Sequence, residues 1–306
     1  MSVTEYSKEK EYVKPKIKRR RFSFLEWLME KIIVISGSLT IIIVFLIFAF
    51  LLKDAYPTFA TEAPGKLLFG REWYPLSGIF GFLPLILGSL LVTAGAVVVG
   101  VPVGVAAAIY IGEVASPRVR EILKPAVETL AAIPSVVIGF LGLVLLAPFL
   151  QKILNLPTGL TAFTGSVMLA FMAMPTIISI SEDALHAVPQ DFRAASLALG
   201  ATRWQTISRV VFPAAKSGIL AAVMLGIGRA IGETMTVLMV TGNAAVIPRS
   251  LFQPVRTMTA TIAAEMGETV QYGAHYHALF AVGMVLFLIT FLINLAADVA
   301  LQRGRR

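Results

Sequence analysis

The sequence contains no cysteine and few charged residues. None of its 306 residues is Cys, which excludes a disulfide scaffold. Charged residues make up 14% of the chain, whereas about a quarter is ordinary in soluble domains. Hydrophobic residues make up 57%, and the mean hydropathy is +0.81. So much apolar surface has to face something other than water, which predicts a membrane protein.

Several motifs that would indicate enzymes or other binding proteins are also missing. No G-x-x-x-x-G-K-[ST] loop is present, so the chain does not bind ATP through a P-loop. No H-E-x-x-H motif or metal-spaced cluster occurs, and we expect no metal or cofactor on this chain. A membrane enzyme is therefore disfavoured. The net charge is +8, but the basic residues flank apolar runs and no groove-reading motif is visible, so we expect no nucleic-acid partner.

Six apolar runs have the length of a membrane-spanning helix, which needs roughly 20 residues. They predict an all-α membrane protein with six transmembrane helices. The predicted spans are 32–52, 83–111, 129–150, 161–181, 217–241 and 278–301. The first run follows a long, charged segment with no cleavage site after it, so we expect this span to be retained as an anchor.

The segments outside these spans suggest an orientation. If the N-terminus is cytoplasmic, Lys and Arg favour the inside segments by roughly three to one, which predicts that both termini are inside. The expected layout is a basic cytoplasmic segment with an interfacial helix at 1–31, the first span at 32–52, an external loop at 53–82, a membrane core at 83–301 that includes a cytoplasmic loop at 182–216, and a basic tail at 302–306.

The cytoplasmic loop 182–216 carries the strongest local signal. Pro189 favours the start of a helix, and Gly200 indicates a break between two helical stretches. Pro213 is expected to stop or bend the second stretch before the fifth span. A helix–Gly–helix unit that protrudes into the cytoplasm has a shape suited to docking on another protein.

The fifth predicted span contains two charges, Arg229 and Glu233. They are four residues apart, so one helix would place both on one face, and Thr236 would extend that face. A charge at membrane depth costs about 2.5–3.5 kcal/mol, and such residues usually line a cavity or pair inside the bundle. We expect Arg229, Glu233 and Thr236 to line a substrate pathway. The alternative is that Arg229 and Glu233 only pair with each other.

The cytoplasmic loop resembles the EAA motif of ABC importer permeases: E-A-A, three residues, G, nine residues, I, one residue, L-P. The spacing is kept, and the matching positions are Ala194, Ala195, Ser196, Gly200, Val210, Phe212 and Pro213. Ala194 stands where the motif has Glu, which puts one polar contact of the loop in doubt. The resemblance implies that the loop is a coupling helix, which fits a groove on a cytoplasmic ATPase subunit.

Four other stretches resemble the phosphate-specific permeases, and the third of them resembles the PstC type. They are IPSVVIGFLG at 133–142, GRAIGETMTVLMVTGN at 228–243, VIPRSLFQPVRTMTATIAAEMGE at 246–268 and YIGEVASPRVREILKPAVE at 110–128. The resemblance covers roughly residues 80–306. A PstA-type sister subunit, a sulfate or molybdate permease and a non-conducting membrane scaffold remain alternatives.

The resemblance also implies partners and a location. It implies a multi-pass protein of a prokaryotic plasma (inner) membrane, paired with a PstA-like second permease. Two cytoplasmic ATPase subunits would bind ATP and Mg, and an external protein would deliver phosphate. Phosphate would then enter the cytoplasm by alternating access.

The orientation can be tested by cysteine labelling, because the native chain has no Cys and therefore no background. We expect Thr158→Cys and Gln253→Cys to react with an impermeant thiol reagent added from outside. Thr202→Cys and Arg305→Cys should stay unlabelled. Labelling of Thr202→Cys from outside would overturn both the orientation and the cytoplasmic docking role of the loop.

Overall fold

The computed structural model describes residues 24–303. Most of the predicted basic N-terminal segment, up to residue 23, and residues 304–306 of the predicted tail lie outside the described residues. The chain forms two compact units, Met1–Ala49 and Phe50–Arg306. The described part of the first unit is helical and belongs to α1 (Phe24–Thr61), which continues into the second unit.

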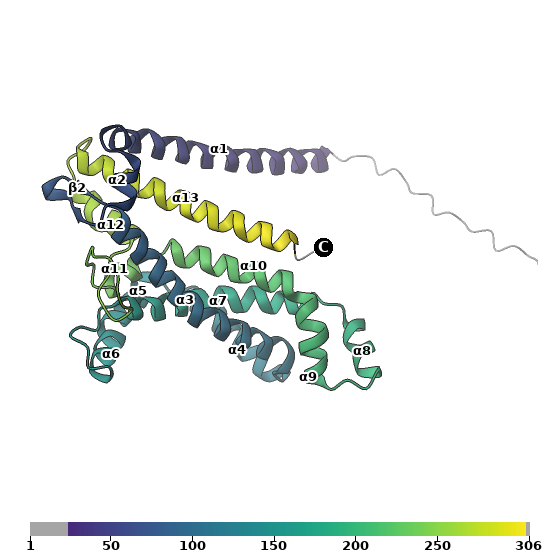
Figure 1. The fold of residues 1–306 in the computed structure, drawn as a ribbon. Helices are drawn as coiled ribbons and strands as arrows, with labels where there is room; N and C mark the ends of the chain where they lie inside the picture. Colours follow the sequence, from purple (N-terminus) through teal and green to yellow (C-terminus); the bar gives the residue numbers. More distant parts are fainter. Residues whose placement is uncertain (1–23, 304–306) are drawn as a thin grey trace, which may run out of the picture. The chain divides into compact units, whose positions relative to one another are not determined.

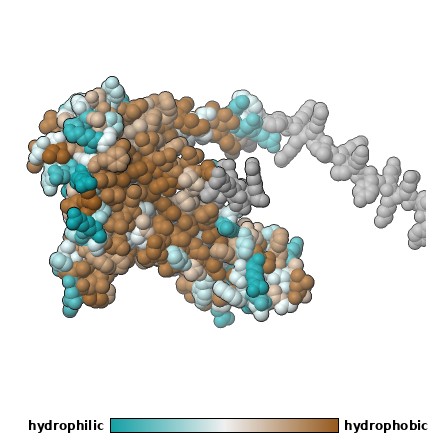
Figure 2. All heavy atoms as spheres, in the orientation of Figure 1, coloured by the Kyte–Doolittle hydropathy of each residue, from teal (hydrophilic) through white to brown (hydrophobic). Residues whose placement is uncertain are grey.

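Within the described residues, six helices are long and apolar enough to cross a membrane. They are Glu26–Thr61, Leu83–Val114, Ser135–Ile153, Ala162–His186, Arg203–Ile231 and Ala274–Val299. This confirms the prediction of a helical protein with six spans. In Figure 2, polar residues gather near the β1–β2 end and over α8 and α9 of the second unit, and apolar residues cover the helices between them.

The elements follow one another as helices with one small β-hairpin. Their bounds are α2 Pro64–Phe69, β1 Trp73–Tyr74, β2 Ile79–Phe80, α3 Leu83–Ile109, α4 Pro117–Ala131, α5 Ser135–Leu141, α6 Ala147–Ile153, α7 Ala162–His186, α8 Gln190–Ala198, α9 Arg203–Thr206, α10 Phe212–Ile231, α11 Met235–Val240, α12 Met258–Glu265 and α13 Ala274–Arg303. The strands pair antiparallel, with Trp73 opposite Phe80 and Tyr74 opposite Ile79.

Two predicted spans differ from the structure. The third was expected at 129–150, but α4 ends at Ala131, and a turn leads through the extended Pro134 into α5. The fifth was expected to run unbroken over 217–241. Instead α10 ends at Ile231, and α11 begins only at Met235. A Pro and a Gly interrupt these runs, and hydropathy alone does not register such breaks.

Pro213 was expected to stop or bend the helix that enters the fifth span, and it does not stop it. Residues 203–231 form one continuous helix in which Ile207–Val211 is a π-helical segment. The N–H of Phe212 donates to the carbonyl of Ile207, one residue further back than in an α-helix. This wider turn directly precedes Pro213, whose ring would otherwise clash with the carbonyl four residues earlier. The π-helical segment Gly142–Leu146 precedes Pro148 in the same way.

Helix α7 lies at the centre of the second unit and packs along both α3 and α10 (Figure 1). Small residues allow the close approach. A Cβ added at Gly100 would lie 3.3 Å from Ala170, and one added at Gly226 would lie 2.5 Å from Ile177. A Cβ added at Gly104 would lie 3.0 Å from Ile177, so Gly100 and Gly104 both serve close helix packing.

Helix α12 is fixed against α3 by an approach that leaves no room for a side chain. A Cβ at Gly88 would lie 2.3 Å from the carbonyl oxygen of Arg256. The neighbouring Ser89 hydroxyl accepts a hydrogen bond of 2.9 Å from the N–H of Met258, the first residue of α12. The Gly88–Ser89 pair thus holds the start of α12 on the N-terminal half of α3.

This approach predicts opposite effects for two Gly→Ala substitutions. Gly88→Ala should destabilise the protein by about 1–3 kcal/mol, because the backbone near Arg256 has to move. Gly65→Ala in α2 meets open space and should stabilise it by about 0.5–1 kcal/mol. Thermal unfolding of the purified transporter in detergent measures both. Equal midpoints for the two variants would show that α12 is not docked on Gly88.

Candidate functional site

Arg229 lies on a side of α10 that the chain itself leaves uncovered. Ala222, Gly226 and Ala230 are buried on the side of α10 that packs toward α7. Arg229 and Leu225, one turn apart, are both exposed. Among the described residues, Arg229 has no ion pair and no hydrogen-bond partner for its guanidinium. A free positive charge is therefore carried on the open side of a membrane-spanning helix.

Glu233 lies in the break between α10 and α11 rather than on a helix. Its side-chain Oε1 accepts a hydrogen bond of 3.1 Å from the N–H of Thr236. Its backbone carbonyl accepts one of 2.8 Å from the hydroxyl of Thr259 on α12. The prediction that Arg229 and Glu233 share a helical face is therefore wrong, because α10 ends at Ile231 and Gly232 follows as its cap. No ion pair joins the two in the described part of the chain.

Thr236 is fully buried, so the prediction that it continues the face of Arg229 is also wrong. Its hydroxyl donates to the carbonyl of Ser135 at 3.1 Å, and it lies 3.0 Å from the sulfur of Met172. These contacts fix α11 against α5 and α7. Thr236 thus positions the segment after the break and does not face an open side of the helix.

A polar cluster that the sequence did not predict holds the C-terminal end of α12. Glu265 accepts a hydrogen bond of 2.5 Å from Arg256 and one of 3.1 Å from the indole N–H of Trp73. His275 Nε2 lies 2.8 Å from Glu265 Oε2, the oxygen that also accepts the Trp73 bond. His275 is thus engaged inside the protein. The partners of Glu265 come from β1, the loop before α12 and the start of α13, so no local spacing in the sequence predicts this cluster.

The segment formed by α8, the Gly200 turn and α9, called the docking unit below for the role predicted from the sequence, has the predicted helix–turn–helix form. Gly200 has a φ of +85°, the left-handed region that favours glycine, and it separates α8 from α9. Thr202 and Gln205 form a reciprocal capping box at the start of α9. The hydroxyls of Ser196 and Thr206 lie 2.9 Å apart and join α8 to α9. These contacts therefore hold the turn in one conformation.

Four large apolar side chains are nevertheless exposed on this otherwise polar unit. Phe192 and Leu197 on α8, Leu199 in the turn and Trp204 on α9 are 54%, 47%, 89% and 65% exposed. Of the motif positions, Ala194 and Ala195 are exposed, Ser196 is buried, and Phe212 packs on a cluster that includes Val211. Val210 is half-buried, and Pro213 is exposed. Exposed apolar side chains on a fixed shape are typical of a protein interface.

Lys124, at the middle of α4, forms ion pairs with Glu182 and Asp183 near the C-terminal end of α7. Lys124 on α4 lies 2.6 Å from the buried carboxylate of Glu182 on α7, and His186 lies 3.0 Å from the other oxygen of Glu182. The hydrogen bond to Glu182 raises the pKa of Lys124, so Lys124 stays charged near neutral pH. No group of three or more potential metal ligands occurs among the described residues.

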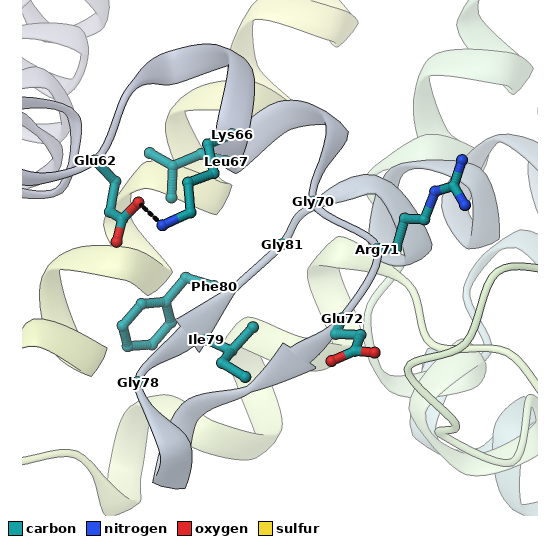
Figure 3. A pocket seen from close by; sticks show the side chains of 10 residues that line it. All are labelled: Glu62, Lys66, Leu67, Gly70, Arg71, Glu72, Gly78, Ile79, Phe80 and Gly81. Atoms are coloured by element: carbon teal, nitrogen blue, oxygen red, sulfur yellow. Dashed lines mark ion pairs between the residues drawn. The ribbon is translucent and has the colours of Figure 1, made fainter.

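A pocket of about 380 Å³ lies beside the β1–β2 hairpin (Figure 3). Lys66 and Glu62 form an ion pair of 2.7 Å in it, and the side chain of Arg71 extends away from that pair. Glu72 also lines the pocket. Because charges of both signs line it, the pocket has no net attraction for an anion.

Comparison with known proteins places this architecture in one family. Residues 100–306 match the family described as binding-protein-dependent transport system inner membrane component. The chain is 40% identical to a probable ABC transporter permease protein YqgH of Bacillus subtilis over 76% of each chain. It is 38% identical to the phosphate transport system permease protein PstC of Mesorhizobium japonicum over 78% of each.

Solved transporters share the fold. A bacterial alginate ABC transporter, determined with an alginate pentasaccharide-bound periplasmic protein, matches with a TM-score of 0.63 at 17% identity, over 92% of this chain and 97% of that one. An inward-facing MetNI methionine ABC transporter matches with a TM-score of 0.54 at 22% identity, over 74% and 95%. Permeases of this kind work with ATPase subunits and a binding protein. The chain belongs to the binding-protein-dependent transport system inner membrane component family, as a multi-pass permease subunit of an ABC importer and not an enzyme.

Proposed function

We propose that this chain moves inorganic phosphate into the cytoplasm, as one half of a heterodimer with a PstA-like second permease. Both termini are then cytoplasmic, and α8 and α9 face the ATPase subunits. The observation that carries the proposal is the exposed Arg229 on α10, with no ion-pair partner among the described residues. The relatives named as PstC phosphate permeases support the choice of substrate.

Lipid is an unfavourable environment for Arg229. A charge at the centre of a membrane-spanning helix costs about 2.5–3.5 kcal/mol, so this side of α10 has to face a second subunit or a water-filled pathway. Phosphate carries roughly one to two negative charges near pH 7, and its passage through a low-dielectric region needs a counter-charge. The planar guanidinium of Arg229 can give two parallel hydrogen bonds to phosphate oxygens.

Glu233 completes the proposed site from the break that follows α10. Its carboxylate is turned toward the start of α11, where it accepts the N–H of Thr236. The negative charge is therefore held by the backbone and leaves Arg229 free for an anion. Thr236 is no part of this pathway, because it is buried among α5 and α7.

The exposed apolar side chains of α8 and α9 are suited to a groove on the ATPase. Phe192, Leu197 and Trp204 project from a unit that Gly200 and the Thr202 capping box hold in one shape. When ATP draws the two ATPase subunits together, the grooves carry these units with them. The spans then open to the outside, where a binding protein delivers phosphate.

Substitutions at Gly200 test whether the docking unit couples ATP hydrolysis to transport. Gly200→Val should leave the protein inserted but uncoupled, because a β-branched residue is strained at a φ of +85°. Gly200→Asn is the matched control, since Asn tolerates the left-handed region and the position is open. The measurement is ATP hydrolysis with and without loaded binding protein. Full stimulation in Gly200→Val would remove the coupling role.

Substitutions at Arg229 test the proposed phosphate pathway. Arg229→Gln should lower phosphate uptake at least about a hundredfold, because two charge-assisted hydrogen bonds are lost. Arg229→Lys keeps the positive charge but loses the two parallel N–H donors of the guanidinium, so this variant should retain part of the phosphate uptake. Radiolabelled phosphate uptake at matched membrane expression measures both. Arg249→Gln removes one exposed external charge and should behave as wild type.

The double substitution Arg229→Gln with Glu233→Gln separates the two roles proposed for the arginine. If Arg229 only neutralised Glu233, removing both charges would restore uptake. Because the structure shows no ion pair between the two within its described residues, we expect the double variant to stay inactive. Restored uptake would reduce both residues to structural roles and remove the main physical argument for an anion.

A further inference from the structure

One arginine joins the docking helix α8 to two membrane-spanning helices. The guanidinium of Arg193 donates to the carbonyl of Val188 at 2.5 Å and to that of Leu185 at 2.8 Å. Leu185 belongs to the last turn of α7, where the helix dipole favours a positive charge, and Val188 lies in the turn that follows. The same guanidinium lies 2.6 Å from the carboxylate of Glu113. Glu113 is 80 residues away in sequence, in the π-helical segment Tyr110–Val114 that ends the span of α3.

This junction is largely closed to solvent. The side chains of Arg193 and Glu113 are 13% and 10% exposed. A second bond, 3.4 Å from Arg193 Nε to Glu113 Oε2, makes the pairing bidentate. A bidentate pair fixes orientation as well as distance, which a single point charge such as Lys does not.

Along the chain, α8 is connected directly only to α7 and, through the Gly200 turn, to α9. The link to α7 is a short non-helical turn, and the link to α9 is held in one shape by the Gly200 turn. The Ser196–Thr206 hydrogen bond restrains α8 toward α9 and hence α10. Glu113 supplies the restraint toward α3, which has no covalent connection to the docking unit.

We propose that Arg193 and Glu113 are positioning residues that make α8 and the inner end of α3 move as one body. The inference rests on the proposed docking of α8 on the ATPase. A displacement of α8 then reaches α3 directly through the Arg193–Glu113 pair, in addition to α7 and α10. Coupling between ATP hydrolysis and transport depends on this lateral link as well as on the docking surface.

Glu113→Gln is the sharpest test, because it removes the charge at constant size and leaves the Arg193 contacts to Leu185 and Val188 in place. In proteoliposomes with ATPase subunits and loaded binding protein, we expect co-purification of the ATPase to be unchanged. Phosphate imported per ATP hydrolysed should fall about tenfold, the scale set by one charge-assisted hydrogen bond. Glu113→Asp keeps the charge and should recover part of the ratio.

The matched control is Glu121→Gln, which removes an exposed carboxylate from α4 on the same side; Glu121 has no ion pair within the described chain. It should leave the ratio unchanged. An unchanged ratio in Glu113→Gln, or loss of ATPase co-purification, would overturn the proposal. The first result would show that the pair transmits nothing, and the second that it only supports folding of α8.

A substrate-independent measurement separates this inference from the phosphate assignment. Spin labels at Asp191→Cys on α8 and Val114→Cys at the end of α3 report the distance between the two elements in the assembled transporter, with and without ATP. We expect a constant distance in the native background and an ATP-dependent change with Glu113→Gln. A distance that changes in the native background would overturn the proposal. Absence of phosphate uptake by the wild type would overturn only the substrate.

Discussion

Lipid offers no hydrogen-bond partner to a backbone N–H or carbonyl, and this constraint decides where a membrane-spanning helix can be interrupted. The fifth span breaks after Ile231, which frees backbone groups of Gly232–Thr234. Side chains satisfy part of them: Thr259 donates to the carbonyl of Glu233, and Glu233 itself accepts the N–H of Thr236. The break persists because other parts of the chain supply these partners.

Several contacts that hold α12 in place follow from that requirement. Thr259 reaches the break only if α12 is held in place, and both ends of α12 are fixed. Gly88 and Ser89 fix its start on α3, while Glu265 fixes its end to Arg256, Trp73 and His275. The segments on either side of α12 thus support the backbone beside Arg229. Glu265, Arg256 and His275 are engaged with one another in this cluster.

Features encoded by local pattern were predictable from the sequence, and those that depend on distant partners were not. Apolar run length identified six spans, and Gly200 identified the turn of the docking unit. Periodicity failed at Glu233 and Thr236, because it assumed a helix that Gly232 ends. The Arg193–Glu113 pair joins residues 80 positions apart. Each of its partners resembles an ordinary charge near the membrane surface, so no spacing rule singles the pair out.

One continuous helix carries both the docking end and the charged end of the proposed pathway. Residues 203–231 run without interruption from the start of α9, beside the Gly200 turn, to two residues beyond Arg229. At 1.5 Å per residue, this rod is roughly 40 Å long. A rod pivoted within the membrane moves its two ends in opposite directions. On the proposed docking of α8 and α9, their displacement shifts Arg229 relative to α12 and the break. On the same proposal, the Arg193–Glu113 pair carries the displacement of α8 to α3 as well.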